Sequence, residues 1–266
     1  MSFEADLRLA IETRSHSAFE ELLSSVEPDT KSAQTVLEAV LAHGDERCLV
    51  ALADRGMLYE SEFGPPLVAV LRVRNYALIP ALVRLGCDPN AVVSGITILG
   101  CAALIGSVEA VRSLVYCGAN VGTVPEGCTG TAMIAAASNK NFAVVQLLVE
   151  KFGANVHPAD KATGNTAMLE AASLDYMDIV RYLIGHGAES YVCNKRGLSL
   201  LYFCLVYDTS LSDVRAFIRK GADRCLVQQP TAAAKFWSKL CRLPTTSKRL
   251  EIAGDLLTGL LPAFLP

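Results

Sequence analysis

The feature that most constrains this chain is a segment of about thirty residues that recurs along the sequence. Three copies of it align in register, beginning at Thr97, Thr131 and Thr166. A glycine closes each copy, 21 positions after the threonine in the first and third and 22 positions after it in the second. Self-similarity at a fixed period is typical of chains in which each copy packs against the next. We therefore expect a repeat protein.

The same spacing extends in both directions from these three copies. Gly56, Gly86 and Gly221 close further copies, and the N-terminal segment fits the pattern without a glycine. The sequence predicts a repeat array over residues 1–230 and a helical C-terminal cap over 231–266, because a terminal repeat needs an amphipathic element to cover its apolar face. The seven predicted copies, numbered one to seven below, lie near 3–30, 31–60, 61–92, 93–126, 127–161, 162–194 and 195–228.

Each copy predicts two helices. The first contains small residues, such as Ala135-Ala136-Ala137, which allow a neighbouring helix to approach closely. The second has apolar residues at positions i, i+1, i+4 and i+5, which indicates one buried face. The closing glycine can end this helix in the left-handed conformation, and the next threonine can cap the following helix. The expected core positions of the second helices are Leu78, Ile79, Leu82, Val83, Ala110, Val111, Leu114, Val115, Val144, Val145, Leu148, Val149, Ile179, Val180, Leu183 and Ile184.

The repeated segment resembles the ankyrin repeat, whose usual pattern is G-x-T-P-L-H-x-A-A-x-x-G-x-x-x-(I/V)-V-x-x-L-L-x-x-G-A-(D/N). The match is strongest from Gly95 to Asn120 and from Gly164 to Glu189, and it is weaker at both ends. The resemblance implies an all-α fold, an ankyrin-type α-solenoid of about seven helix-turn-helix repeats with short hairpin fingers and a helical C-terminal cap. It also implies a non-catalytic scaffold that binds a partner protein on the concave surface formed by first helices and fingers.

The histidine of the T-P-L-H motif is absent from this chain. Its hydrogen bonds between loops must be made otherwise or lost, so we expect a lower stability than the family pattern would give. The residues in its place are Glu38, Val68, Gly100, Ile134, Leu169 and Tyr202.

The family's variable surface positions include the two that follow the small-residue pair of the first helix. Carried across copy by copy, these positions predict an apolar strip formed by Val73, Leu104, Ile105, Leu174, Val206 and Tyr207, with the polar Asn139 in the same register. An exposed patch of this kind marks protein interfaces. The alternative is that the side chains tilt into the core between helices. The full sets are Glu12, Ala42, Arg72, Leu104, Ser138, Ser173 and Val206 for the first position, and Thr13, His43, Val73, Ile105, Asn139, Leu174 and Tyr207 for the second.

The loops between copies, called fingers here, are shortest near the N terminus and longer in the middle of the array. The fingers at 124–130 and 157–164 should project furthest and contact a partner first. The alternative is that loop lengths merely drift between copies. The candidate contact residues in these fingers are Pro125, Glu126, His157, Asp160 and Lys161.

Composition and motifs argue against other functions. A net charge of -3 and a pI near 5.8 give no basic face for nucleic acid. Gly185-His186-Gly187 follows a helix instead of opening one, so it is not a phosphate-binding loop. No stretch of sequence offers four closely spaced zinc ligands. We expect no cofactor, no metal and no catalytic residues.

The positions of the histidines in the sequence argue against cysteine catalysis. A cysteine nucleophile needs a histidine base within reach. The four histidines are assigned to different copies, which a solenoid should keep apart. The best local pair, His157 with Asp160, is interpreted as a solvated part of a finger. The full set is His16, His43, His157 and His186.

The nine cysteines indicate free thiols in a reducing compartment, because none forms a C-x-x-C pair. The start carries Glu4 and Asp6, unlike a secretory signal, and the apolar C-terminal stretch is too short to span a bilayer. We expect a monomeric array located inside the cell, in the cytoplasm or the nucleus, with another protein as its partner.

The C-terminal tail leaves one alternative function open. Residues 239–243 read KLCRL, which resembles the core of the box through which some ankyrin proteins recruit a ubiquitin ligase. The position four residues before Cys241, usually leucine, is Trp237 here. The alternative is therefore a substrate-recognition adaptor of a ubiquitin ligase that acts through the tail, as opposed to a pair of capping helices.

Overall fold

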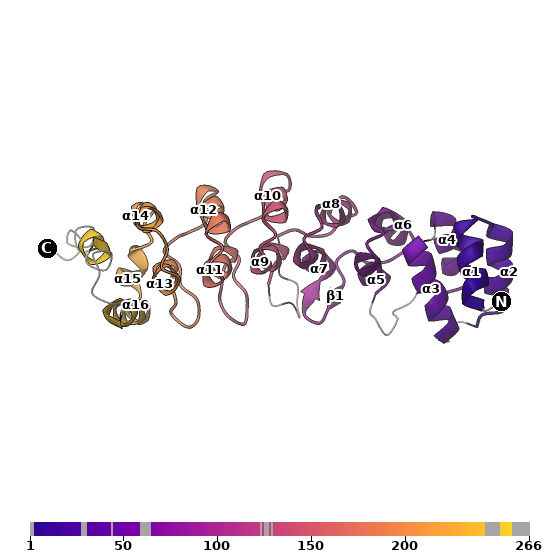
Figure 1. Cartoon of the computed structure of the whole chain (residues 1–266), viewed down its shortest axis with the longest axis horizontal. Coiled ribbons are helices and arrows are strands. Elements are labelled where there is room, and N and C mark those ends of the chain that lie inside the picture. Colours follow the sequence, from indigo (N-terminus) through magenta and orange to yellow (C-terminus); the bar gives the residue numbers. More distant parts are fainter. Residues whose placement is uncertain are drawn as a thin grey trace. The chain divides into compact units, whose positions relative to one another are not determined.

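The computed structural model describes residues 3–27, 31–43, 45–58, 65–122, 124, 128, 130–242 and 251–256. The chain forms two compact units, Met1–Cys128 and Thr129–Pro266. Both units consist of paired helices joined by loops (Figure 1), which confirms the all-α class predicted from the repeats. No helix among the described residues is long and apolar enough to cross a membrane.

In the first unit, successive first helices pack side by side, and the second helices form a layer against them. Helix α3 packs on α1 and α5, and α5 packs on α7, while α4 contacts α2 and α6. Strands β1 and β2 form an antiparallel hairpin in which Val92 pairs with Thr97. The elements are α1 (Phe3–Glu12), α2 (His16–Ser24), α3 (Lys31–His43), α4 (Glu46–Asp54), α5 (Pro66–Val73), η1 (Tyr76–Leu78), α6 (Ile79–Arg84), β1 (Val92–Val93), β2 (Ile96–Thr97), α7 (Ile98–Ile105) and α8 (Val108–Tyr116).

The second unit repeats this arrangement. Helix α11 packs on α9, α12 and α13, and α16 packs on α13 and α15. Figure 1 shows α9, α11 and α13 in one row and α10, α12 and α14 in another. The elements are α9 (Ala132–Ser138), α10 (Phe142–Glu150), α11 (Ala167–Ser173), α12 (Met177–Gly185), α13 (Leu200–Val206), α14 (Leu211–Arg219), α15 (Arg224–Gln228) and α16 (Pro230–Arg242).

The first helices begin where the sequence predicts. The hydroxyl of Thr97 accepts a hydrogen bond from the Gly100 amide at 3.0 Å, and Thr131, Thr166 and Ser199 cap their helices in the same way. Each cap satisfies one of the amides that a helix start leaves unpaired. The small residues that follow lie fully in the core, where they permit close helix packing; they include Ala102, Ala103, Ala136, Ala137, Ala171 and Ala172.

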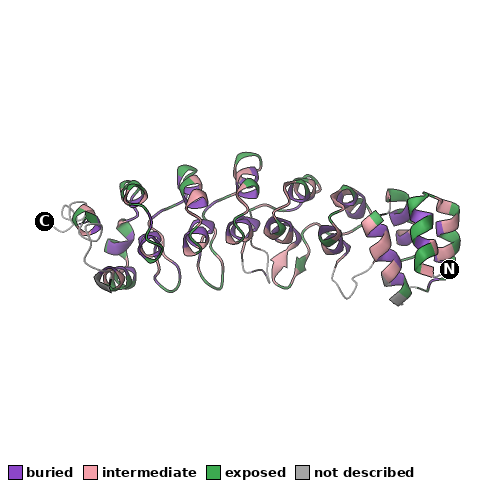
Figure 2. Cartoon of the chain, viewed as in Figure 1, coloured by how far each residue is buried: buried purple, intermediate pink, exposed green. Residues whose placement is uncertain are grey.

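The second helices bury a narrower face than the sequence predicts. Figure 2 shows both buried and exposed residues on these helices. Positions i, i+1 and i+4 are buried in all four copies considered. At position i+5 Ile184 is buried, but Val83, Val115 and Val149 are half-buried. With 3.6 residues per turn, position i+5 lies about 140° around the helix from position i. It therefore lies at the edge of the buried stripe, where the neighbouring helix covers only part of the side chain.

Asparagine side chains supply hydrogen bonds between loops of the second unit. Asn194 donates from Nδ2 to Oδ1 of Asn165 at 2.9 Å, and Asn165 donates to Glu170 at 2.7 Å. Oδ1 of Asn194 also accepts from the amides of Arg196 and Leu198. Asn165 and Asn194 are both buried. These hydrogen bonds connect neighbouring loops, and the lower stability expected from the absent histidine stays a prediction.

Two glycines of the second unit share a positive φ but differ in their surroundings. A Cβ atom on Gly164 (φ +75°) would lie 2.8 Å from the backbone nitrogen of Lys195, whereas one on Gly187 (φ +92°) would meet nothing within 4 Å. We expect Gly187→Ala to cost about 1 kcal/mol of unfolding free energy through backbone strain alone. Gly164→Ala should cost clearly more, because the clash adds to the same strain. Urea denaturation of both variants measures the difference, and equal losses would contradict the predicted clash.

Candidate functional site

The apolar strip lies at the C-terminal ends of the first helices. In the first unit Ile105 is exposed, whereas Val73 and Leu104 are half-buried. In the second unit, Leu174, Val206 and Tyr207 are exposed, as is Asn139. The exposed fractions of Ile105, Leu174, Val206 and Tyr207 lie between 37 and 45 %. Large apolar side chains therefore face solvent at the same register in both units.

The backbone that follows the strip has an uncommon conformation. In each of five first helices, a residue other than glycine adopts a positive φ directly after the second strip position or its equivalent. Gly106 takes this place in the α7 copy, with φ +80°. A side chain in the left-handed region costs of order 1 kcal/mol, so glycine would be the easier choice. Sequence reasoning missed these turns, although Gly106 in the same register is a signal for them. The five residues are Arg14, Arg74, Lys140, Asp175 and Asp208.

Tyr207 is held in place by a hydrogen bond across two copies. Its hydroxyl donates to the backbone oxygen of Ser173, the last residue of α11. Leu174 follows directly as the C-terminal cap of that helix. The ends of α11 and α13 therefore present Leu174, Val206 and Tyr207 together, with the tyrosine ring fixed instead of free to turn.

A groove in the first unit extends the surface of its first helices. It has a volume of about 280 Å³ and is open to solvent. Val73 of the apolar strip forms part of its wall. The lining residues come from α1, α3 and α5: Glu4, Leu7, Arg8, Thr35, Glu38, Ala39, Ala42, His43 and Val73.

The two fingers contain the remaining predicted contact residues. Pro125 and Glu126 lie outside the described residues. In the other finger, His157 and Lys161 are exposed, and Asp160 is half-buried. Oδ1 of Asp160 accepts from the amides of Ala162 and Thr163, so this carboxylate organises the finger.

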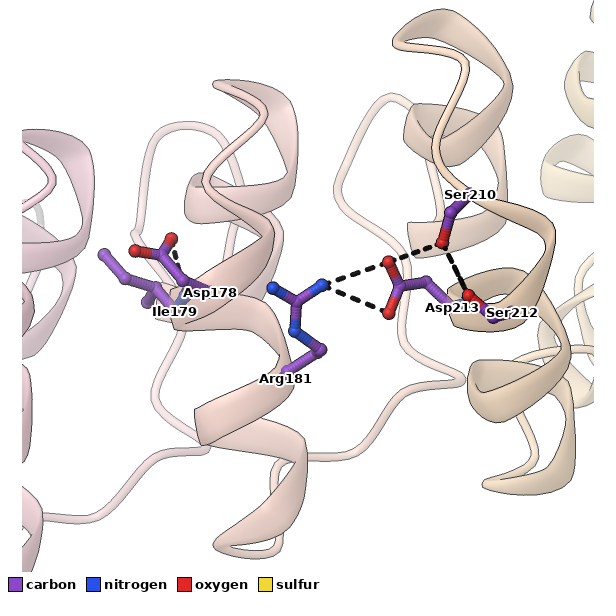
Figure 3. A network of polar contacts seen from close by, with 6 residues as sticks. All are labelled: Asp178, Ile179, Arg181, Ser210, Ser212 and Asp213. Atoms are coloured by element: carbon purple, nitrogen blue, oxygen red, sulfur yellow. Dashed lines mark hydrogen bonds and ion pairs between the residues drawn. The ribbon is translucent and has the colours of Figure 1, made fainter.

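The second helices of the second unit carry polar contacts on their outer face. Arg181 on α12 donates to both carboxylate oxygens of Asp213 on α14, at 3.1 and 3.0 Å (Figure 3). Asp213 also accepts from Ser210, the residue that caps α14. Such surface pairs contribute about 0 to 1 kcal/mol each. They indicate a solvated face that links neighbouring copies.

Tyr182 continues this polar face from α12 to α10. Its hydroxyl donates to Glu150 at 2.9 Å. Burial and the neighbouring Glu150 carboxylate raise the pKa of Tyr182 to about 12, because both disfavour a phenolate. The hydroxyl therefore stays protonated and able to donate at neutral pH.

The histidines are not all kept apart from the cysteines, which corrects one expectation. His16 of the first copy lies beside Asp45 and Cys48 of the second, with Nε2 of His16 3.5 Å from Oδ2 of Asp45. The expectation failed because adjacent copies pack their second helices, α2 and α4, against each other. Burial raises the pKa of the Cys48 thiol, and the Asp45 carboxylate adds to the effect. A buried, protonated thiol is a poor nucleophile, so this cluster does not support cysteine catalysis.

Comparisons with known proteins connect this geometry to a family. A sequence model of ankyrin repeats matches residues 67–160 and 133–227. Over 164 residues, or 62% of the chain, the sequence is 29% identical to a mouse protein described as B-cell lymphoma 3 protein homolog. That match spans 31% of the mouse protein, so the chain covers about a third of this relative's length.

Two solved ankyrin structures are similar in fold. The ankyrin repeat domain of Bcl-3, described as a unique member of the IkappaB protein family, superposes with a TM-score of 0.66 at 23% identity. The match covers 86% of this chain and 100% of that domain. The human ASB11 ankyrin repeat domain gives a TM-score of 0.58 at 21% identity, covering 73% of this chain and 89% of that one.

Proposed function

Because this chain belongs to the ankyrin repeat family, we propose that it is a non-catalytic scaffold that binds a partner protein through its apolar strip. Repeats of this kind are protein-binding modules whose side-by-side helices offer an extended surface. The proposal assigns the contact to the ends of the first helices and to the finger at 157–164.

The observation that carries this proposal is the contrast between two faces of the second unit. The ends of α11 and α13 expose Leu174, Val206 and Tyr207, whereas the outer face of α12 and α14 pairs Arg181 with Asp213. Covering apolar surface contributes about 25 cal/mol for each Å² removed from water. A partner therefore gains more on the first-helix face, and the fixed Tyr207 ring loses little freedom on binding.

Two valines of the second unit provide a matched test. Val206, at the end of α13, and Val227, on α15, are 37 and 42 % exposed. We expect Val206→Asp to weaken partner capture from a cell lysate at least about tenfold, because an unpaired carboxylate would be buried at the contact. Val227→Asp should leave capture unchanged.

Quantitative mass spectrometry of the captured proteins measures this effect, with circular dichroism as the check that both variants fold. If the same partners are recovered in equal amounts with both variants, Val206 is not part of the binding surface. The fingers or the tail would then be the proposed binding site in place of the apolar strip.

The inside of the cell is the proposed setting for this function. Eight of the nine cysteines have side chains that the structure describes, and these eight are free thiols. Burial raises the pKa of several of them, Cys204 to about 12 and Cys225 to about 11. Such thiols are typical of chains that work under reducing conditions.

The adaptor function remains the second proposal, and one observation weighs against it. Leu240, the first leucine of the KLCRL segment, is buried in α16 together with Phe236. Its burial favours a capping role, because a leucine in the core is not available to a ligase subunit. Co-purification of Elongin and a cullin with the full chain, and their loss on deletion of residues 231–266, would favour the adaptor function instead.

A further inference from the structure

Three side chains that commonly bind metals meet at the N-terminal ends of α2 and α4. They are His16, Asp45 and Cys48, and their possible ligand atoms all lie within 4.8 Å of one another. His16 is the first residue of α2, Asp45 caps α4, and Cys48 lies in the first turn of α4. Two adjacent copies therefore contribute to one cluster, which no single stretch of the sequence reveals.

The two carboxylate oxygens of Asp45 make different contacts. Oδ1 accepts from the amides of Arg47 and Cys48, both at 3.1 Å, and so caps α4. Oδ2 faces His16 at 3.5 Å. The carboxylate can therefore keep its capping hydrogen bonds while its second oxygen contacts another group.

A comparison of the copies shows that a thiol is unusual at the position of Cys48. Cys48 occupies the position that Leu78, Ala110, Val144 and Ile179 take in other copies. All four of those residues are buried and apolar, so the position needs only an apolar side chain for packing. The second copy carries a metal-binding atom there, directly beside a histidine and a carboxylate.

One member of the cluster, Asp45, borders an open groove with an acidic wall. The groove has a volume of about 640 Å³ and is lined in part by Asp45, Glu20, Glu46 and Asp54, with Arg47 as the basic residue in its wall. Glu20 lies one turn after His16 on α2. The carboxylates favour the approach of a cation, and the open groove leaves room for a water molecule beside the cluster.

The geometry suits a small divalent cation of the zinc class. Bonds of about 2.0 to 2.3 Å to nitrogen, oxygen and sulfur place neighbouring ligand atoms about 3.3 to 3.8 Å apart in a tetrahedron. The contact between His16 and Asp45 already has this spacing, and the upper limit of 4.8 Å requires only small side-chain rotations. A set of imidazole, thiolate and carboxylate favours zinc over magnesium or calcium, which prefer oxygen ligands alone.

We propose that His16, Asp45 and Cys48 bind one zinc-class divalent cation, with water from the groove as the fourth ligand. On binding, the thiol proton of Cys48 passes to the solvent and the sulfur coordinates as a thiolate. The bound ion connects α2 to α4 and so stabilises the first two copies against separation.

Cobalt(II) is the probe for this site, because a cobalt–thiolate bond gives a charge-transfer absorption that carboxylate or histidine sites lack. The untagged, reduced chain of 266 residues should bind one cobalt ion with this absorption, and zinc should displace it. Cys48→Ala should abolish the absorption, whereas Cys117→Ala, a control at a half-buried cysteine outside the cluster, should retain it.

Two milder variants keep the test independent of folding. His16→Gln changes a partly exposed side chain, and Asp45→Asn keeps an oxygen that can cap α4. Each should weaken zinc binding at least about tenfold in competition titrations, and zinc should raise the melting temperature of the wild type more than that of either variant. Absence of a cobalt–thiolate band in the wild type would overturn the proposal. A band that persists in Cys48→Ala, or unchanged zinc affinity in both milder variants, would overturn it as well.

Discussion

Replacement of Leu183 by aspartate is expected to unfold the second unit and to divide the thermal transition of the chain into two. Leu183 lies on α12 and has 0% of its surface exposed. Truncating a buried leucine alone costs about 2 to 5 kcal/mol, and an unpaired buried carboxylate costs several kcal/mol more. That total is a large part of the roughly 5 to 15 kcal/mol that stabilises an ordinary domain.

Circular dichroism and calorimetry measure this result, since repeat proteins lose cooperativity when one part is selectively weakened. Leu174→Asp is the matched control, because Leu174 belongs to the same unit but is 39 % exposed. Its melting curve should stay close to that of the wild type. A single cooperative transition of Leu183→Asp at the wild-type temperature would show that Leu183 is not part of the core.

The second large effect is expected from Asn194→Asp. The variant keeps an oxygen that accepts from the amides of Arg196 and Leu198, but it loses the donor to Oδ1 of Asn165. Turning the Asn165 amide over would not help, because its oxygen would then face Glu170. Two buried oxygens face each other in either orientation. We expect a loss of about 2 to 4 kcal/mol in unfolding free energy at neutral pH.

The loss of unfolding free energy in Asn194→Asp should depend on pH. Burial and the facing oxygen raise the folded-state pKa of the new carboxyl group above its unfolded value. The destabilisation is therefore largest above the folded pKa and shrinks as the pH falls through it, since a protonated carboxyl can donate to Asn165. Urea denaturation at several pH values measures this. Asn155→Asp, at an exposed position that accepts from the His157 amide, is the control and should change stability by less than about 0.5 kcal/mol. A loss in Asn194→Asp that does not depend on pH would contradict the proposed contact.

The candidate surface was predictable in part. The register of the repeats places Ile105, Leu174, Val206 and Tyr207 at first-helix ends, and these four side chains are exposed. Leu104 and Val73 are half-buried instead of exposed. The register of the repeats predicts which helix end a residue occupies, but not how closely a neighbouring helix covers its side chain. The role of all these residues in binding stays a prediction.

The sequence by itself determined the repeated helix pairs of this protein, their caps and most of their buried stripe. Those features depend on interactions within one copy, such as the Thr97 hydroxyl with the Gly100 amide three residues later. Tertiary structure decided which side chains of neighbouring copies contact each other. The contact between Asn165 and Asn194 joins residues 29 positions apart, and the cluster of His16, Asp45 and Cys48 joins two copies. Such pairs form because packed helices bring unrelated positions together, and no periodicity within one copy encodes the distance between their side chains.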